Sequence, residues 1–560
     1  MGWRRATAMA VVLVGWLGCD PAPAPEPLEL PDTVIAKDTL PAVKDTDGAE
    51  VDKDAVWPLD ANPPQPVPPP FAASCTTAWT FALPQLPEPT GDIGMETGSA
   101  MSAVGQEEQL FIYVILPGKS TLDTAATGPL QLSVDAGTEV LSVTNAVKGI
   151  GSALLRFQTE GPHPITVTFG DGRTGTATVY AYTTQLPVWH ITLADGMWQA
   201  MKANPYLKKE YPCTLRIGDT QYLEATIRLR GGSSVDLPKK SFHIKLKNGS
   251  ALPNGHDNLI LRGEYIDKTL MRTWLGYDAF RQATWLPAPA TAFVHLRINQ
   301  SFYGVLQSVE HIDGNFLKLR NRDPNGALYE GDPPHDISAL GANFTPLAKT
   351  DQYKVLYQKH EGPKSYADLI AFVEDVLQRQ DGVLFATLEQ HLKVRDWIEY
   401  AALMAVLQNR EHIRKNWYMY RNFSAADDRF ELLAWDLDVT WGHLWSEQLD
   451  ILDEAIITDL PADVGRFALD NKFYNQLYRV LDNPAWRKLW AQRVLALADV
   501  VLDDAFLQPR LSYLQCLLTP DLLADQRKRS TNAEFVQRVG EISTFAKARR
   551  QFLHQSLETP

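Results

Sequence analysis

The spacing of the apolar residues changes along this chain, and that change limits the folds that the chain can adopt. From about residue 86 to 184, short runs alternate between apolar and polar residues, with Gly, Asp, Asn and Pro between the runs. A period of two is typical of strands that bury one face. The runs are Leu110–Leu116, Leu130–Val134, Ala153–Phe157, Ile165–Phe169 and Thr176–Tyr182. They predict an immunoglobulin-like β-sandwich over residues 72–185.

From residue 186 onward the pattern is mixed. Residues 221–230 and 240–246 alternate and predict two strands joined by a glycine-containing turn. Five later segments repeat apolar residues at three and four, which predicts helices. These segments are Tyr366–Leu377, Phe473–Leu481, Trp486–Leu502, Leu522–Arg529 and Phe535–Phe552. We therefore expect an α+β domain at 186–460, followed by a helical C-terminal part at 461–556 that packs on it.

The length and composition agree with several folded domains. A chain of 560 residues is too long for one core, since cores stop growing near ~250–300 residues. Hydrophobic residues make up 45% of the chain, which is ample for buried cores. The net charge of −14 argues against a nucleic-acid partner, because binding phosphates requires clustered cations. We expect a monomer.

The segment 20–70 differs from the rest of the chain. It holds eleven acidic residues against three lysines, and thirteen of the 37 prolines. Such a composition cannot bury enough apolar surface to fold. We predict a disordered, extended linker.

The first nineteen residues predict export. Two arginines precede the apolar run Ala6–Leu17, which is too short to span a bilayer core of ~30 Å and reads as a signal peptide. The run ends in Gly18-Cys19, a pattern that resembles the bacterial lipoprotein signal, in which the cysteine is lipidated. We predict an exported lipoprotein, periplasmic or at the cell surface, that is held to a membrane through Cys19. The alternative is an ordinary signal peptide with a chance cysteine.

Three further cysteines remain, Cys75, Cys213 and Cys516. An odd number in an exported chain allows one disulfide and one free thiol. The sequence does not predict which two pair.

Acidic residues between positions 411 and 438 are the candidates for chemistry. Glu411 lies five residues before Asn416, and Asp436 and Asp438 follow two residues apart. Protein-kinase-like folds place their base and metal ligands in this order. Two nearby aspartates supply the hard oxygen ligands that Mg²⁺ and Mn²⁺ prefer. The same two aspartates also fit the DxD motif of a glycosyltransferase that binds a nucleotide sugar.

An ordered series of motifs over about residues 186–445 resembles the spore-coat protein H (CotH) kinase family. The motifs include RLRG and PKKSF at 228–242, DKTLMR at 267–272, NQSFYGVLQSVEHID at 299–313, ALYEGD at 327–332, NWYMY at 416–420 and WDLD at 435–438. The resemblance implies an atypical protein-kinase-like fold for residues 186–460. It also implies transfer of phosphate from ATP to protein Ser or Thr with Mg²⁺ or Mn²⁺.

The resemblance also assigns roles to individual residues. Asn416 and Asp436 would hold the metal, and Asp438 would share or orient that role. The residues that would contact the nucleotide are Lys240, with Lys239 as its alternative, Arg230, Ser234 and Glu310. Strand alternation places Lys240 on the face of Phe242, so we expect Lys240 to be the inward lysine.

The sequence departs from the family pattern at Glu411. The resemblance leads us to expect Asp at this position, as the base. Glu has the same acid chemistry, but its extra methylene moves the carboxylate, and a shift of ~1 Å can slow a positioned reaction by ~100-fold. A pseudokinase or surface interaction protein with a degenerate site is therefore the first alternative to a kinase. The DxD-type glycosyltransferase is the second.

Overall fold

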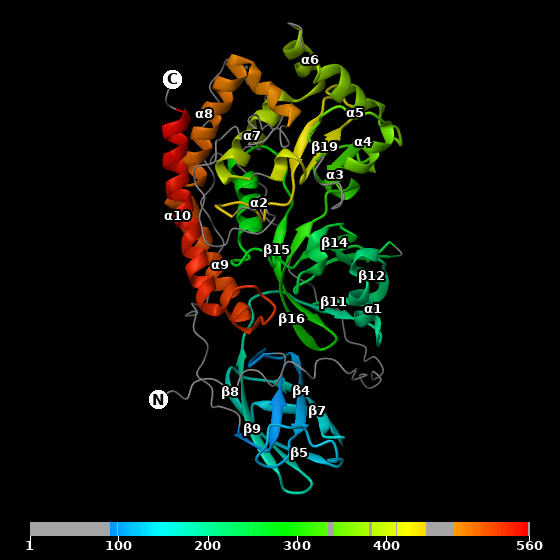
Figure 1. The fold of residues 1–560 in the computed structure, drawn as a ribbon, viewed down its shortest axis with the longest axis vertical. Helices are drawn as coiled ribbons and strands as arrows, with labels where there is room; N and C mark the ends of the chain where they lie inside the picture. The colour runs from blue at the N-terminus through cyan, green and yellow to red at the C-terminus, as the bar shows by residue number, and fades with distance from the viewer. Residues whose placement is uncertain are drawn as a thin grey trace.

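The computed structural model in Figure 1 describes residues 90–557, apart from 98, 248, 334–340, 380–382, 410 and 444–474. The predicted signal peptide with Cys19, the predicted linker at 20–70 and Cys75 lie outside these described residues. The chain is multidomain, with a large β-rich N-terminal region and a helical C-terminal part. Within the described ranges, no helix combines the length and the apolar composition that crossing a membrane requires.

Two sheets pack face to face in the first region. One has the order β1-β9-β8-β5, with β3 beside β9, and the other has the order β2-β4-β7-β6. The strands are β1 (Thr90–Gly91), β2 (Ile93–Glu96), β3 (Met101–Ala103), β4 (Glu107–Val114), β5 (Leu130–Val134), β6 (Thr138–Val147), β7 (Ile150–Phe157), β8 (Gly161–Phe169) and β9 (Thr174–Tyr182). Side chains of both sheets, such as Ile112 and Val167, form one core. The five predicted runs are confirmed as strands, whereas the edge strand β6 was not predicted because most of its side chains are exposed and mark no buried face.

Seven strands of the next region close into a barrel in the order β10-β11-β12-β13-β14-β16-β15. They are β10 (Val188–Thr192), β11 (Tyr211–Ile217), β12 (Thr220–Arg230), β13 (Ser241–Leu246), β14 (Asn258–Arg262), β15 (Thr291–Ile298) and β16 (Ser301–Glu310). The two predicted strands are confirmed as β12 and β13. Parallel pairing of β10 with β15 closes the barrel around an apolar core. This closure joins segments about a hundred residues apart, so local periodicity does not reveal it.

A second, four-stranded sheet has the order β18-β17-β19-β20. Its strands are β17 (Ala327–Gly331), β18 (Tyr357–Glu361), β19 (Trp417–Arg421) and β20 (Glu431–Ala434). The helices before the C-terminal part are α1 (Met197–Ala203), α2 (Arg272–Ala283), α3 (Gly314–Leu319), α4 (Thr350–Leu356), α5 (Ala367–Ala371), α6 (Leu384–His391) and α7 (Val394–Leu407). The predicted helix at 366–377 is α5 continued by a π-helical turn, Phe372–Val376.

The C-terminal part contains a 3-10 helix, Gln476–Asp482, and the helices α8 (Pro484–Val501), α9 (Asp504–Ala524) and α10 (Asn532–Leu557). These helices run along one side of the molecule and share one large core with α7 and β19 (Figure 1). The predicted helix at 522–529 is wrong, because α9 ends at Ala524. Sequence reasoning missed α9 because it contains two prolines, which normally interrupt helices, and because apolar residues occupy most of its sides.

Buried polar contacts fix the sandwich to the barrel and to α9. Arg297 of β15 pairs with Glu108 of β4 at 3.2 Å, and both side chains are almost fully buried. Asp521 of α9 accepts hydrogen bonds from Tyr182 at 3.0 Å and from Thr184 at 2.7 Å, and it lies 2.6 Å from Nδ1 of His295. Because these polar groups are removed from water together, each contact strengthens the others. The stability of the sandwich, the barrel and α9 is therefore coupled.

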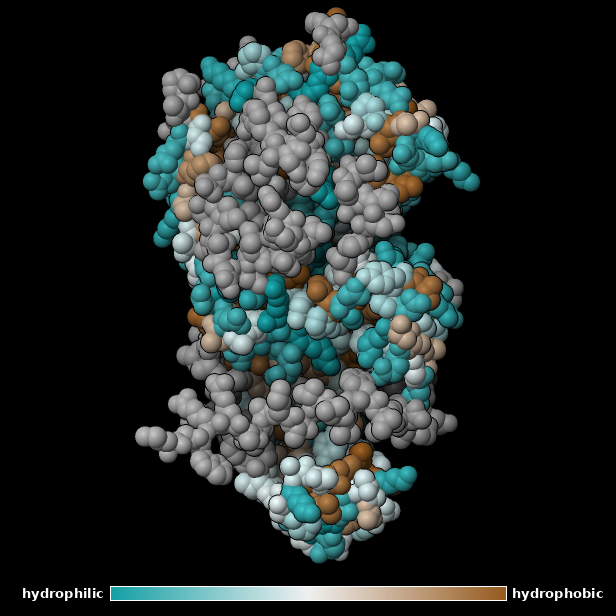
Figure 2. Space-filling model, in the orientation of Figure 1, coloured by the Kyte–Doolittle hydropathy of each residue, from teal (hydrophilic) through white to brown (hydrophobic). Residues whose placement is uncertain are grey.

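Two of the cysteines, Cys213 and Cys516, lie among the described residues. Cys213 is free and buried, whereas Cys516 is disulfide-bonded. Burial raises the pKa of the Cys213 thiol to about 12, which leaves it unreactive near neutral pH. On the described part of the face in Figure 2, apolar residues are scattered among hydrophilic ones.

Candidate active site

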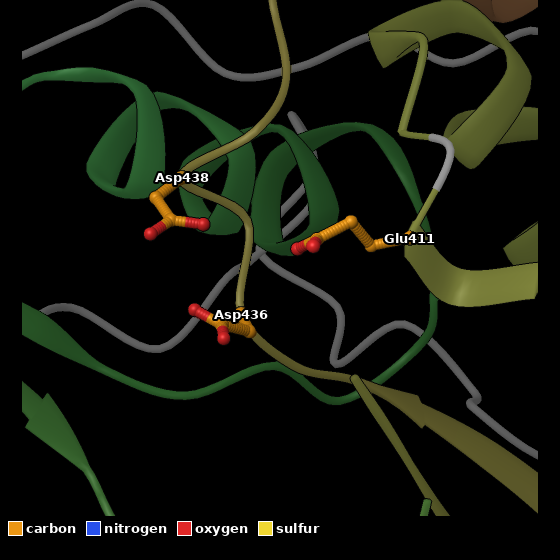
Figure 3. A group of neighbouring side chains, drawn as sticks. All are labelled: Glu411, Asp436 and Asp438. Atoms are coloured by element: carbon orange, nitrogen blue, oxygen red, sulfur yellow. The ribbon is translucent and has the colours of Figure 1, made fainter. Parts of the chain in front are cut away.

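Three carboxylates converge where the second sheet meets the barrel. Glu411 belongs to a 3-10 turn, Glu411–Ile413, that follows α7, while Asp436 and Asp438 lie in the loop after β20. One oxygen from each side chain lies within 4.8 Å of the other two. Figure 3 shows the three carboxylates directed toward a common space. A cluster of hard oxygen ligands at this separation fits a divalent cation such as Mg²⁺ or Mn²⁺.

Backbone contacts hold the aspartate loop in an unusual conformation. Asp436 has a φ of 56°, which non-glycine residues adopt only where the surroundings enforce it. Its N–H donates to the Tyr277 hydroxyl of α2 at 3.1 Å, and Thr440 donates to the Leu437 carbonyl at 2.7 Å. Leu437 is fully buried against Gly276, where an added Cβ would lie 2.9 Å from its side chain. The loop is therefore anchored on α2.

Glu411 is held at both ends. The Asn409 side chain accepts a hydrogen bond from the backbone N–H of Glu411 at 2.9 Å. Of the carboxylate oxygens, Oε2 accepts from Asn416 at 2.6 Å, and Oε1 pairs with Lys415 at 2.9 Å. The structure thus brings the predicted base and the predicted ligand Asn416 together, and both Glu411 oxygens have partners.

Arg262 connects the cluster to the barrel. It ends β14, and its guanidinium contacts Glu264 at 2.6 Å, Asp438 at 2.9 Å and also Asp436. Glu264 has a fully buried side chain and accepts a further hydrogen bond from Thr273 at 3.1 Å. One cation at the end of a barrel strand is therefore shared among three acids, two of them from the loop after β20.

The charges around the cluster set the protonation of its acids. Burial and the neighbouring Asp436 carboxylate raise the pKa of Asp438 well above its usual range. Burial also opposes ionisation of Asp436, but Arg262, Lys415 and Arg230 outweigh it and lower the pKa of that carboxyl. Asp332, after β17, has its pKa raised to about 6 by burial and by Glu330.

Two of the predicted nucleotide contacts lie in and beside the turn after β12. The Arg230 guanidinium lies 5.2 Å from the centre of the Trp435 ring, next to Asp436 in the chain. Ser234 belongs to the short 3-10 turn Ser233–Asp236. Gly231 has a φ of 120°, and a Cβ there would lie only 1.9 Å from the Ser234 hydroxyl oxygen. The Ser234 hydroxyl could rotate away, but the positive φ still favours glycine at this position.

The two lysines have exchanged the roles that alternation assigned to them. Phe242 is buried in the barrel as predicted, but β13 begins at Ser241, so alternation does not extend back to the lysines. Lys239, not Lys240, is the inward lysine: it pairs with Asp525 at 2.7 Å, and both side chains are completely buried. Lys240 is half-buried and donates to the Val235 carbonyl at 2.7 Å, within the turn.

Glu310, the remaining predicted nucleotide contact, has a different set of partners. It ends β16 and pairs with His256 at 2.8 Å and Arg320 at 2.5 Å, and it accepts from the Ala290 N–H at 2.8 Å. Desolvation opposes its ionisation, but the hydrogen bonds from His256 and Arg320 lower its pKa to about 2. In this structure Glu310 binds neighbouring elements together.

Sequence reasoning did not identify Arg262, Glu264 or Lys415. Arg262 and Glu264 flank Gly263 directly after the apolar residues of β14, and a charged residue at the end of a buried strand was a usable signal. Lys415 immediately precedes Asn416, but many surface lysines look the same in a sequence.

Comparisons with known proteins show the family to which this chain belongs. The family model described as CotH kinase protein matches residues 227–553. The chain therefore belongs to the CotH kinase protein family. Among curated proteins, it is similar to the inner spore coat protein H of Bacillus subtilis (strain 168), with 23% identity over 376 residues, covering 66% of this chain and 98% of that protein.

A solved structure of the Shewanella oneidensis MR-1 toxin–antitoxin system HipA, HipB and its operator DNA also matches. The identity is 12%, the match covers 69% of this chain and 78% of that one, and the TM-score is 0.26. A score this low supports no conclusion about a shared fold.

Proposed function

We propose that this chain is an exported, membrane-tethered protein kinase of the CotH type, which transfers phosphate from ATP to Ser or Thr of a protein. The observation that carries the proposal is the convergence of Glu411, Asp436 and Asp438 within 4.8 Å of one another. Membership of the family supports it. In this proposal the barrel and the second sheet are the two lobes of an atypical kinase-like fold, and the first region is an immunoglobulin-like sandwich.

The donor set fits a divalent metal. Asp436 and Asp438 would hold Mg²⁺ or Mn²⁺, and the Glu411 carboxylate lies close enough to share in it. When bound, the ion neutralises charge on the phosphates that are being transferred.

The protein's own groups account for the remaining steps. Glu411 accepts the proton of the substrate hydroxyl, while Asn416 and Lys415 hold its carboxylate in place. Arg230 supplies positive charge beside Trp435, where phosphates would approach Asp436. Lys240 can leave the Val235 carbonyl to meet a phosphate, because it is only half-buried.

One observation favours a pseudokinase as the second candidate. Both oxygens of Glu411 are already bonded, to Asn416 and to Lys415. Each oxygen keeps a second lone pair, but the two contacts fix the orientation of the carboxylate, so a substrate hydroxyl can approach only the positions that remain free. The same fold would then serve as a binding module at the cell envelope.

The test is phosphoryl transfer by an Asp436→Asn variant of the full chain. With γ-labelled ATP and Mn²⁺, we expect wild type to label itself or added protein, and the variant to lose at least about 100-fold of that rate, because a ligand to the charge-neutralising ion is gone. Asp427→Asn is the matched control, since Asp427 forms a partly exposed pair with Arg429 at 2.7 Å. Labelling by Asp436→Asn equal to that of wild type would refute the proposed site.

A further inference from the structure

Three basic side chains lie near one aromatic residue, Tyr303, at the end of the barrel where β13 and β16 begin. The Lys202 Nζ of α1 lies 5.0 Å from the centre of the Trp198 ring, and that ring packs edge-on against the Tyr303 ring at 5.8 Å. The Arg527 guanidinium, from the loop after α9, lies 5.0 Å from the centre of the Tyr303 ring. The Tyr303 hydroxyl accepts the backbone N–H of Lys240 at 2.7 Å. We call Lys202, Lys240 and Arg527 the basic cluster.

The members of the basic cluster are held in place but still reach solvent, because each is half-buried. Arg527 donates through Nη1 to the carbonyls of Phe302 at 3.2 Å and Tyr303 at 3.1 Å. Lys240 donates through Nζ to the Val235 carbonyl at 2.7 Å. These neutral carbonyls fix the two cations without compensating their charge.

The acids beside the basic cluster do not balance it. Asp525 is already paired with the buried Lys239 at 2.7 Å. Burial lowers the pKa of Lys240, and the charge of Asp236 opposes that shift. Burial also lowers the pKa of Lys202, and the charges of the other two members of the basic cluster lower it further. The three cations therefore repel one another, and a bound anion would relieve that repulsion.

We propose that the basic cluster binds a phosphate monoester on a protein, a serine or threonine that is already phosphorylated. The inference rests on the proposed function, since phosphoserine and phosphothreonine are the products of the proposed kinase. Lysine and arginine together hold a phosphate dianion through charge-assisted hydrogen bonds.

The position of the basic cluster fits this ligand. Arg230, at the end of β12, lies beside Trp435 and so next to Asp436 of the candidate active site. Lys240 ends the turn that follows β12. One substrate segment would therefore carry a phosphate at the basic cluster while another of its hydroxyls approaches the candidate active site.

Fluorescence anisotropy tests the proposal, with the full chain, no ATP and a labelled peptide that carries one phosphoserine. We expect wild type to bind this peptide at least about tenfold more tightly than the same peptide with serine. Lys202→Met and Arg527→Met should each weaken binding at least about tenfold, because each removes a cation that contacts the phosphate. Lys209→Met is the matched control and should change the affinity by less than about twofold. Lys209 is exposed, and its Nζ lies 5.1 Å from the centre of the Tyr211 ring.

The outcomes separate this proposal from the proposed function. Equal affinity for the two peptides, or unchanged binding by both methionine variants, would overturn the proposal and leave phosphoryl transfer untouched. Displacement of the peptide by ADP would place the basic cluster in the nucleotide site and would also overturn it. So would tighter binding of inorganic phosphate or of glycerophosphoglycerol than of the peptide, which would indicate a free ion or a lipid headgroup.

The Asp436→Asn variant provides the reverse comparison. It should bind the phosphoserine peptide as wild type does, although it loses phosphoryl transfer. Absence of transfer by wild type, with peptide binding intact, would refute the proposed function alone. Circular dichroism of each variant confirms that it is folded, and if Arg527→Met does not fold, the Lys202→Met affinity decides the question.

Discussion

At the scale of single residues, Glu411 decides whether the site transfers phosphate. Its carboxylate lies within 4.8 Å of those of Asp436 and Asp438, yet Asn416 and Lys415 already contact its two oxygens. Removing the extra methylene would draw the carboxylate back from one of these partners. Removing its charge would leave Lys415 bonded to a neutral group.

We therefore expect opposite effects from two substitutions. Glu411→Asp should keep or raise the transfer rate, and Glu411→Gln should lower it by about 100-fold or more, because the amide keeps the size but cannot accept the proton. Initial rates with γ-labelled ATP provide the measurement, with thermal unfolding to check each variant. Equal rates in all three proteins, well above background, would show that Glu411 is not the base. Rates at background in all three would support the pseudokinase.

Glu310 gives a prediction for stability against pH. Its pKa in the folded chain is about 2, below the usual 4.5, so its ionised form stabilises the fold. That stabilisation is complete above about pH 4.5 and is lost as the pH falls toward 2. Glu310→Gln should lower the free energy of unfolding at pH 7 by roughly 3 kcal/mol.

The difference between Glu310→Gln and wild type should shrink as the pH falls from 4.5 to 2. Urea denaturation at pH 7, 5 and 3 measures it. The matched control is Asp351→Asn, which breaks an exposed pair with Lys354 on α4 and should leave stability nearly unchanged. A Glu310→Gln deficit that is the same at every pH would contradict the role given to its charge.

At the scale of elements, the sequence predicts the strands and helices that show their own period. Five sandwich strands, β12, β13, α8 and α10 fall within a few residues of the predicted ranges because each buries one face. The closed barrel and α9 could not be predicted in this way. Closure depends on the pairing of Val188–Ile191 with His295–Ile298, and α9 contains Pro509 and Pro520.

The residues of the candidate site also fall into those that a local sequence pattern predicts and those that it does not. The sequence order of Glu411, Asn416, Asp436 and Asp438 was enough to predict a cluster, since an acid before Asn and a close pair of aspartates form a local pattern. The partners that distant parts of the chain contribute could not be predicted. Arg262 reaches Asp438 across 176 residues of chain, and Lys239 reaches Asp525 across 286. No local pattern signals contacts of that length.

The Lys239–Asp525 pair links the start of β13 to the end of α9. Asp525 also accepts a hydrogen bond from the Val305 N–H at 3.0 Å, so one carboxylate joins three elements. Lys239→Met should lower the free energy of unfolding by about 3–5 kcal/mol, because it leaves a buried carboxylate without its cation. Lys547→Met removes an exposed partner of Asp504 and should cost less than about 1 kcal/mol. Urea denaturation of both variants compares them, and equal midpoints would count against a stabilising role for the buried pair.

At the scale of the whole molecule, the proposed tether would determine where the proposed kinase acts. If Cys19 is lipidated, Cys19→Ser should move the protein from the membrane pellet to a soluble or unprocessed form, since the acyl chains are lost. Fractionation of expressing cells with detergent partitioning provides the measurement. A Cys213→Ser variant is the control, because that thiol is free and buried in the barrel. Unchanged partitioning of Cys19→Ser would exclude lipid anchoring through that residue.

The buried contacts of Arg297 and Asp521 limit how this chain can be cut. The family match begins at residue 227, inside β12, so a fragment trimmed to that boundary would lose β10 and β11 and leave the barrel open. A cut at residue 186 would keep the barrel but strip Glu108 from Arg297, and Tyr182 and Thr184 from Asp521. The smallest fragment that keeps the family-matched part properly folded should therefore start before β1.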